Sequence, residues 1–310
     1  MTSSTVKKKG QRSRWFTLVW VIPVVLVLLT AVVFGAQWLR TLSGVQSFVT
    51  NYPGHVQPPV GTPEGFPEWL RWSHFFNMLL ILMIIRSGWN VRTTQRPPAY
   101  WTRNNRGLIR TKGKPNKVSL DLWLHLTLNV LWVVTGIAFY VLLFSTGQWQ
   151  RLVPTSWEHI PNALSAALQY ASLDWPLENA WVSYNSLQMI TYFVTVFVAA
   201  PLSIITGIRM SGAWPKDAKI NKVYRVETAR AIHFPVMLYF VLFIIGHVTL
   251  VFATGALRNL NHIFAGRNDE SWVGFWFFAG ALVLMAVLWV SAQPILLRPI
   301  ASLTGSVTKK

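Results

Sequence analysis

The chain of 310 residues is 52% hydrophobic, has only 12% charged residues and carries a formal net charge of +18. A soluble domain usually has about 25% charged residues, so the composition argues against an ordinary soluble protein and favours a polytopic membrane protein. The sequence contains no cysteine, which excludes disulfides, thiolate-held iron–sulfur clusters and haem attached through a Cys-x-x-Cys-His motif.

Six apolar stretches predict transmembrane helices, because each approaches or exceeds the about twenty residues that cross the hydrocarbon layer. In chain order they cover 15–39, 70–88, 118–146, 186–211, 229–255 and 272–292. The first stretch follows a basic tail at 1–14, and a signal peptide also begins with basic residues before an apolar run. Its apolar run is too long for a signal peptide and no small-residue cleavage site follows it, so we expect a retained helix. The predicted fold is an all-α, polytopic membrane helix bundle.

The connecting segments differ in composition. Residues 40–69 are rich in proline and glycine, which predicts an irregular loop without a core of its own. The segment 89–117 is polar. The segment 148–185 contains a run at 161–170 whose pattern predicts a short helix at the membrane interface. Residues 293–310 are the predicted C-terminal tail.

Positive charge is concentrated in two of these segments. Residues 86–117 hold nine lysines and arginines and no acid, and 209–230 hold six with two acids. By contrast, 148–185 has one arginine against three acids. The positive-inside rule therefore predicts that both termini and the two basic loops are cytoplasmic. Because the charges alternate with spans, topology explains them, and we expect no nucleic-acid partner.

Four histidines lie within the predicted spans: His74, His125, His233 and His247. The last two are on one helix, separated by about 21 Å of rise and nearly four turns. Both side chains therefore lie on the same face of that helix, at two different depths in the bilayer. The predicted topology puts His74 near the outer surface and His125 near the inner surface. Depth matching then pairs His74 with His247, and His125 with His233.

Such pairs are suited to hold haem iron. Two neutral imidazoles from facing helices can fill both axial positions, and a six-coordinate haem carries electrons without an open site for oxygen or substrate. The alternative is that the histidines are buried polar residues that bridge helices by hydrogen bonds. Polar groups at membrane depth are costly and tend to be functional, which favours haem for four histidines at two matched depths. We therefore predict two haem b groups in a four-helix haem-binding core.

Four further residues are candidate haem contacts. Arg71 and Arg230 each precede a candidate ligand by three residues, on the interfacial side, where a guanidinium can pair with haem propionates. Both also fit as ordinary positive flanks. Gly88 lies on the same helix face as His74, at the depth of the His125–His233 pair. Gly136 lies on the same helix face as His125, at the depth of the His74–His247 pair. A missing side chain there would admit the macrocycle, and close helix packing is the alternative.

The remaining three histidines fall in predicted outer loops, where we expect surface roles rather than metal ligation. They are His55, His159 and His262.

The order and spacing of the four intramembrane histidines resemble a known family. One histidine early in each of two successive helices, followed by a His-x13-His helix, is the pattern of the di-haem cytochrome b subunits of formate dehydrogenases and nickel–iron hydrogenases. These belong to the bacterial b561-type superfamily. The resemblance covers about 70–255. It implies a bacterial plasma-membrane subunit that passes electrons between a catalytic partner and the quinone pool, with quinone beside the haem of His74 and His247.

Three features depart from that pattern: the helix before the first ligand helix, the final span and the long loop at 148–185. They leave the partner and its docking side open. A molybdopterin-dependent oxidoreductase is one candidate, since similar six-helix proteins accompany such enzymes. Two other functions stay open, a standalone transmembrane reductase for an outer acceptor and a proton-coupled transporter. The near absence of acids from the spans disfavours the transporter.

Overall fold

The computed structural model describes residues 14–105, 114–175, 179–215, 217 and 219–309. Most of the predicted basic tail at 1–14 lies outside these residues. The described part contains six helices long and apolar enough to cross a membrane. They cover Val19–Leu39, Glu68–Thr93, Leu120–Ser145, Ser186–Met210, Val226–Ala253 and Val273–Ser291. The six predicted spans and the mostly helical membrane fold are confirmed.

The spans are helical because a helix satisfies its own peptide groups where no water is present. Their outward side chains are apolar, and Leu242 and Val283, for example, are 70% and 65% exposed. The third span begins at a polar cap. The hydroxyl of Ser119 accepts a hydrogen bond of 3.2 Å from the Leu122 amide at the start of the third span. The predicted ends of the six spans differ from the observed ends by only a few residues.

The chain divides into two compact units. The first contains α1 (Arg14–Leu39), α2 (Ser43–Asn51) and α5 (His159–Ala171). Arg40, just after α1, pairs with Asp174 at 2.5 Å and donates to the Ser172 hydroxyl at 2.7 Å. The short helix predicted at 161–170 is confirmed by α5. A short helix, α2, lies within the segment 40–69, and none of the residues of α2 is buried.

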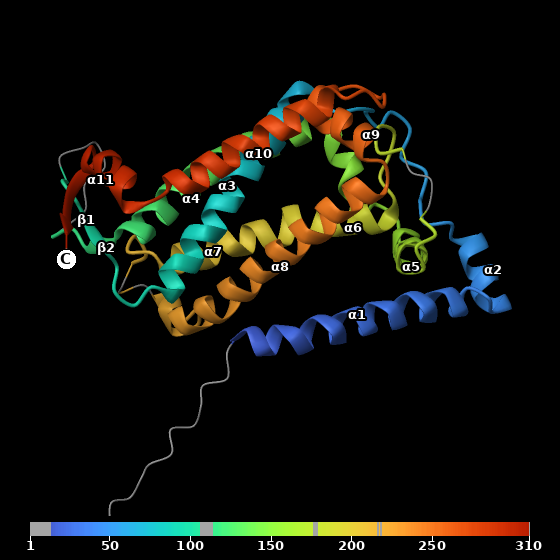
Figure 1. Ribbon diagram of the computed structural model, residues 1–310. Helices are drawn as coiled ribbons and strands as arrows, with labels where there is room; N and C mark the ends of the chain where they lie inside the picture. The colour runs from blue at the N-terminus through green and yellow to red at the C-terminus, as the bar shows by residue number, and fades with distance from the viewer. Residues whose placement is uncertain (1–13, 106–113, 176–178, 216, 218, 310) are drawn as a thin grey trace, which may run out of the picture. The chain divides into compact units, whose positions relative to one another are not determined.

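The second unit holds the histidine-bearing helices (Figure 1). Its long helices are α3 (Glu68–Thr93), α4 (Leu120–Ser145), α7 (Ala200–Met210), α8 (Val226–Ala253) and α10 (Val273–Ser291). Helix α3 packs along α4, and α7 packs along α8. Buried Ala199, Val236 and Phe240 join these two pairs of helices, with partly buried side chains of α3 and α4 around them. The packing therefore brings α3, α4 and α8 around one core.

One span is interrupted. Helix α6 (Ser186–Phe193) leads into a π-helical turn, Val194–Ala199, before α7 begins. Pro201 follows this turn and lacks the N–H that a regular helix would use there. The irregular turn has a partner on the neighbouring helix, because the Tyr140 hydroxyl donates to the Val196 carbonyl at 2.5 Å.

A small antiparallel sheet was not predicted. It has the order β2-β1-β3, formed by Lys117–Ser119, Ala99–Arg103 and Gly305–Lys309. It packs with α11 (Pro294–Ser302) against the start of α4, in a cluster that includes Ala99, Leu120 and Leu124. The predicted polar loop and C-terminal tail thus fold together. The pairing of β1 with β3 joins segments about two hundred positions apart, so no local sequence pattern predicts it.

Candidate functional site

The structure brings together the two histidine pairs that the topology predicts. His74 on α3 and His247 on α8 have ring centres 6.3 Å apart, with an interplanar angle of 56°. His125 on α4 and His233 on α8 have ring centres 6.5 Å apart, with an angle of 80°. Each pair thus joins α8 to a different helix, and the two pairs lie about four turns apart along α8.

The ring separations fit a shared metal ion better than a direct contact. A hydrogen bond between two imidazoles would place their centres about 5 Å apart. A metal–nitrogen bond of about 2 Å from each ring to one ion places the centres about 6 Å apart. Both observed separations match the second arrangement. The residues present therefore fit an iron held between two axial imidazoles.

Hydroxyl groups orient the rings of the His125–His233 pair. Oγ1 of Thr206 lies 2.8 Å from Nδ1 of His233, and Oγ of Ser87 lies 3.1 Å from Nδ1 of His125. Each hydroxyl is within donating distance of carbonyls one turn earlier in its own helix, such as Leu202 for Thr206 and Met83 for Ser87. Since a hydroxyl has one proton, each accepts from Nδ1–H of its histidine. The lone pair is then on Nε2, as metal ligation requires.

Aromatic rings surround the other pair. Phe243 stacks on His247 with ring centres 5.6 Å apart and an angle of 8°. Phe264 meets His74 edge-on at 6.3 Å. Nδ1 of His247 lies 3.5 Å from the Tyr192 hydroxyl, the limit for a hydrogen bond. Nδ1 of His74 is buried and has no hydrogen-bond partner among the described residues. Packing, rather than hydroxyl groups, orients this pair.

Glycines lie beside the His125–His233 pair. A Cβ added to Gly88 would come within 3.0 Å of Cε1 of His125, and one added to Gly207 within 3.5 Å of Cε1 of His233. Gly88 therefore stands at the pair to which its own helix contributes no histidine, as predicted. A Cβ added to Gly136 would meet no atom of the described residues within 4 Å. Gly207 is a position that sequence reasoning missed.

The two candidate arginines differ in their surroundings. Arg71 lies 3.6 Å from the Glu68 carboxylate and packs so closely against Gly266 that an added Cβ there would lie 2.8 Å from its guanidinium. Its Nε is buried without a hydrogen-bond partner among the described residues. Arg230 is exposed at the start of α8. Arg71 is partly buried, with 23% of its side chain exposed, and has one unsatisfied donor, so it is the better placed to hold an anionic group.

Two of the three loop histidines are not at the surface, which corrects the prediction. His159 and His262 are 5% and 1% exposed, whereas His55 is exposed. Nδ1 of His159 lies 3.1 Å from the Ser186 hydroxyl. The ring of His262 stacks on Phe66 at 5.5 Å. Burial is the main cause that lowers the pKa of His262, so neutral rings serve here as packing elements.

A buried arginine ties the loops of the second unit together. Arg151 is 3% exposed and donates to the carbonyls of Gly65 and Ala180. Its guanidinium also lies over the rings of Phe66 and Tyr184, at 5.1 Å and 4.8 Å. Burial raises the pKa of Tyr184, and the charge of Arg151 opposes that rise. Such a cation holds three separate loop segments at the start of α3.

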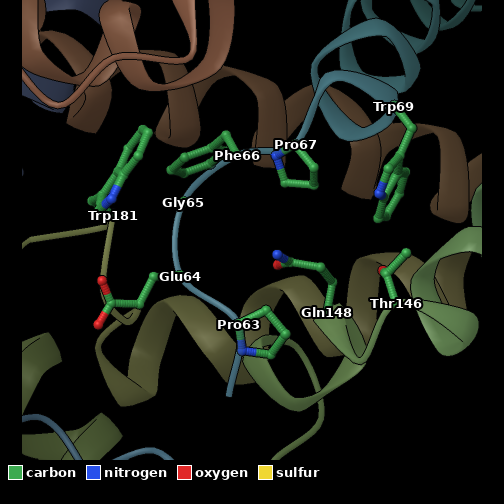
Figure 2. A pocket seen from close by; sticks show the side chains of 9 residues that line it. All are labelled: Pro63, Glu64, Gly65, Phe66, Pro67, Trp69, Thr146, Gln148 and Trp181. Atoms are coloured by element: carbon green, nitrogen blue, oxygen red, sulfur yellow. The ribbon is translucent and has the colours of Figure 1, made fainter. Parts of the chain in front are cut away.

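A cavity of about 540 Å³ opens among the same loops (Figure 2). The rings of Phe66, Trp69 and Trp181 form much of its wall, and the amide end of Gln148 points into it. Nε1 of Trp69 is buried and has no hydrogen-bond partner among the described residues. Trp69 precedes His74 by five residues on α3. The cavity therefore lies close along the chain to the His74–His247 pair.

A family model, prokaryotic cytochrome b561, matches residues 65–266. That range covers all four intramembrane histidines and most of the chain. The chain belongs to the prokaryotic cytochrome b561 family. No curated protein and no solved structure matches it. Membership makes this a multi-pass membrane protein with a haem b electron-transfer role, and it implies a redox partner.

Within this cytochrome b561-family chain, sequence reasoning missed the residues that orient the histidines. Ser87 and Thr206 are each followed directly by a glycine that lies close to the same histidine, Gly88 and Gly207. A Ser-Gly or Thr-Gly pair within a span is therefore the signal that would have found them. Arg151 and His262 gave no such signal, because loop sequences do not reveal burial.

Proposed function

We propose that the chain conducts electrons across the membrane through two b haems, each held by a histidine pair. His74 with His247 and His125 with His233 are the proposed iron ligands. The two ring separations of 6.3 Å and 6.5 Å are the observation that carries the proposal. Each haem, when bound, supplies reversible one-electron transfer. The chain's own residues would hold each haem through the imidazoles, which Ser87, Thr206 and Phe243 orient.

Further residues support the same sites in this proposal. Arg71 and Arg230 pair with haem propionates, and the unsatisfied Nε of Arg71 supports this role. Gly88 and Gly136 admit the macrocycles, which is supported by the close approach of Gly88 to His125 and by the open space at Gly136.

We further propose that the chain sits in the bacterial plasma membrane with both termini cytoplasmic. The support is the positive charge of 86–117 and 209–230, which the positive-inside rule assigns to the cytoplasm. Electrons pass between a catalytic oxidoreductase subunit, for which a molybdopterin enzyme is one candidate, and the quinone pool.

The cavity beside Trp69 is the proposed quinone site. A quinone is a flat ring with two carbonyl acceptors, so aromatic walls and N–H donors suit it. Phe66 and Trp181 supply walls, and the free Trp69 N–H and the Gln148 amide supply donors. Trp69 precedes His74 by five residues on α3, which supports a quinone site beside the His74–His247 haem rather than the other haem.

The haem proposal is tested by counting haems in the purified protein. A pyridine haemochrome assay and a reduced-minus-oxidised spectrum should give about two b haems per chain. His74→Ala or His125→Ala should each remove about one haem. His55→Ala is the control, because that histidine is exposed and outside the pairs, and it should leave the count unchanged. A protein without haem absorbance, expressed with ample haem, would contradict the proposal.

The quinone proposal is tested separately with Trp69→Phe, which removes the indole N–H and keeps an aromatic ring. Oxidation of haem by a quinone analogue should become severalfold slower, while the haem count stays the same. Trp72→Phe is the matched control, since Trp72 lies on the same helix with 59% exposure. Equal rates in both variants would reject this cavity as the quinone site.

A further inference from the structure

Helix α11 begins immediately after a transmembrane span. α10 ends at Ser291 and α11 begins at Pro294, so only Ala292 and Gln293 separate them. In Figure 1, α11 follows the end of α10, and it packs against β1 and β3. With nine residues, α11 is too short to cross the hydrocarbon layer. Its position is therefore at the boundary between hydrocarbon and headgroups.

The two faces of α11 have different surroundings. Leu297 and Ala301 are 8% and 0% exposed and pack in the cluster that joins the sheet to α4. The other face carries apolar side chains that protein does not cover. They are Ile295, Leu296 and Ile300, with exposures of 75%, 51% and 55%, together with the C-cap residue Leu303, which is 81% exposed. These four fall within one sector of the helix, since their spacing follows the helical repeat.

Basic side chains border this apolar face. Arg298 lies on α11 and donates from its guanidinium to the Pro98 carbonyl at 3.3 Å. Lys309 pairs with Ala99 across β3 and β1, so it shares the sheet face of Ala99, which packs with α11. The segments 84–120 and 292–310 contain no acid. An apolar face bordered by uncompensated positive charge matches the surface of an anionic leaflet.

We propose that α11 lies in the membrane interface and anchors the β2-β1-β3 sheet to anionic phospholipid. Ile295, Ile300 and Leu303 enter the acyl boundary, and Arg298 and Lys309 meet lipid phosphates. The leaflet thereby holds the sheet against the start of α4, the helix that carries His125. This anchor depends only on the membrane-spanning fold, not on the proposed haem ligands.

The chain contains no cysteine, so single cysteines can be introduced and spin-labelled in the full-length protein. Labels at Ile300→Cys and Leu303→Cys report the outward face of α11. Val283→Cys, on the exposed face of α10, is the reference within the hydrocarbon. Thr308→Cys is the aqueous reference, because Thr308 pairs with Tyr100 and so faces away from α11. Oxygen concentrates in the hydrocarbon layer and a water-soluble nickel complex stays in water. The ratio of their collision rates with each label therefore rises with the depth of the label in the membrane.

In vesicles of equal parts phosphatidylcholine and phosphatidylglycerol, the labels at 300 and 303 should show a severalfold higher oxygen-to-nickel ratio than the label at 308. A ratio equal to that at 308 would overturn the anchor. Shielding of both labels from both reagents would also overturn it, because protein rather than lipid would then cover the face.

The charge requirement is tested by lipid composition. The label at 303 should lie deeper with phosphatidylglycerol than in pure phosphatidylcholine, and Lys309→Gln, alone or with Arg298→Gln, should diminish that difference. Lys117→Gln is the control, because Lys117 pairs with Thr102 and lies on the opposite face of the same sheet. The single variant Lys309→Gln changes an exposed strand end and leaves the core intact. Equal depth in both lipids would overturn recognition of anionic lipid.

Discussion

Oγ1 of Thr206 lies 2.8 Å from Nδ1 of His233. Because the same hydroxyl lies 2.7 Å from the Leu202 carbonyl, to which it donates, it accepts the Nδ1 proton and leaves the lone pair of His233 on Nε2. A hydrogen bond donated by Nδ1–H raises the basicity of Nε2, the ligating nitrogen. This relationship orients a proposed ligand and tunes it as well.

Thr206→Val should therefore raise the midpoint potential of the His125–His233 haem, on the order of tens of millivolts, because a less basic ligand stabilises ferric iron less. Thr206→Ser retains the hydroxyl and should leave the potential near that of the unchanged protein. A spectroscopic redox titration measures both. An identical potential in the valine and serine variants would contradict the tuning role.

Gly88→Ala should reduce haem occupancy at the His125–His233 site. The new methyl group would lie 3.0 Å from Cε1 of His125, a neighbour fixed by its own hydrogen bonds to Ser87 and the Ile84 carbonyl. Gly280→Ala, where no described atom lies within 4 Å, is the matched control. The haem count per chain is the measurement, and full occupancy in Gly88→Ala would argue against a constrained ring.

Arg71→Gln should lower the midpoint potential of the His74–His247 haem, on the order of tens of millivolts, because a nearby positive charge favours the reduced, less positive centre. Arg230→Gln concerns an exposed side chain and should shift the other haem less. Redox titration at low and high salt measures the difference. A shift confined to the His125–His233 haem would contradict the assignment of Arg71.

Arg151→Gln should destabilise the folded protein by about 2–4 kcal/mol, because it removes charge-assisted hydrogen bonds from two buried carbonyls. The control is Arg267→Gln, since Arg267 is 54% exposed and pairs with Asp269. That change should cost at most about 0.5 kcal/mol. Thermal loss of the haem absorption band reports both, and similar melting temperatures would exclude a structural role for Arg151.

Acidification should destabilise the loops around His262. Burial lowers the pKa of this ring below its ordinary 6.5 in the folded protein. The unfolded chain therefore binds more protons once the pH falls below 6.5, and the stability contributed above that pH is lost progressively toward the lower, folded pKa. The melting temperature should fall between about pH 7.5 and about pH 5.5, and by less in His262→Gln. His55→Gln, at an exposed site, should retain the full dependence.

Much of the fold followed from the sequence for a physical reason. Hydrocarbon imposes helices of a minimum length, so six apolar runs predicted six spans with boundaries good to a few residues. The juxtaposition of His125 with His233 followed from helix rise and alternating direction alone. Gly88 followed from the same arithmetic, since it lies beside His125. The surface role expected for His262 was wrong, because loop composition carries no information about which neighbours will cover a side chain.

The sequence by itself determined the class of protein, the spans and the pairing of four histidines, because depth in a bilayer depends only on position along a helix and its direction. The tertiary structure decided which residues orient those histidines and which loops and strands pack together at the ends of the helices. Thr206 meets His233, Arg151 meets Gly65, and β3 meets β1 across distances in the chain that no periodic pattern encodes. Such contacts arise only when the helices have packed, because packing selects the neighbours of each polar group.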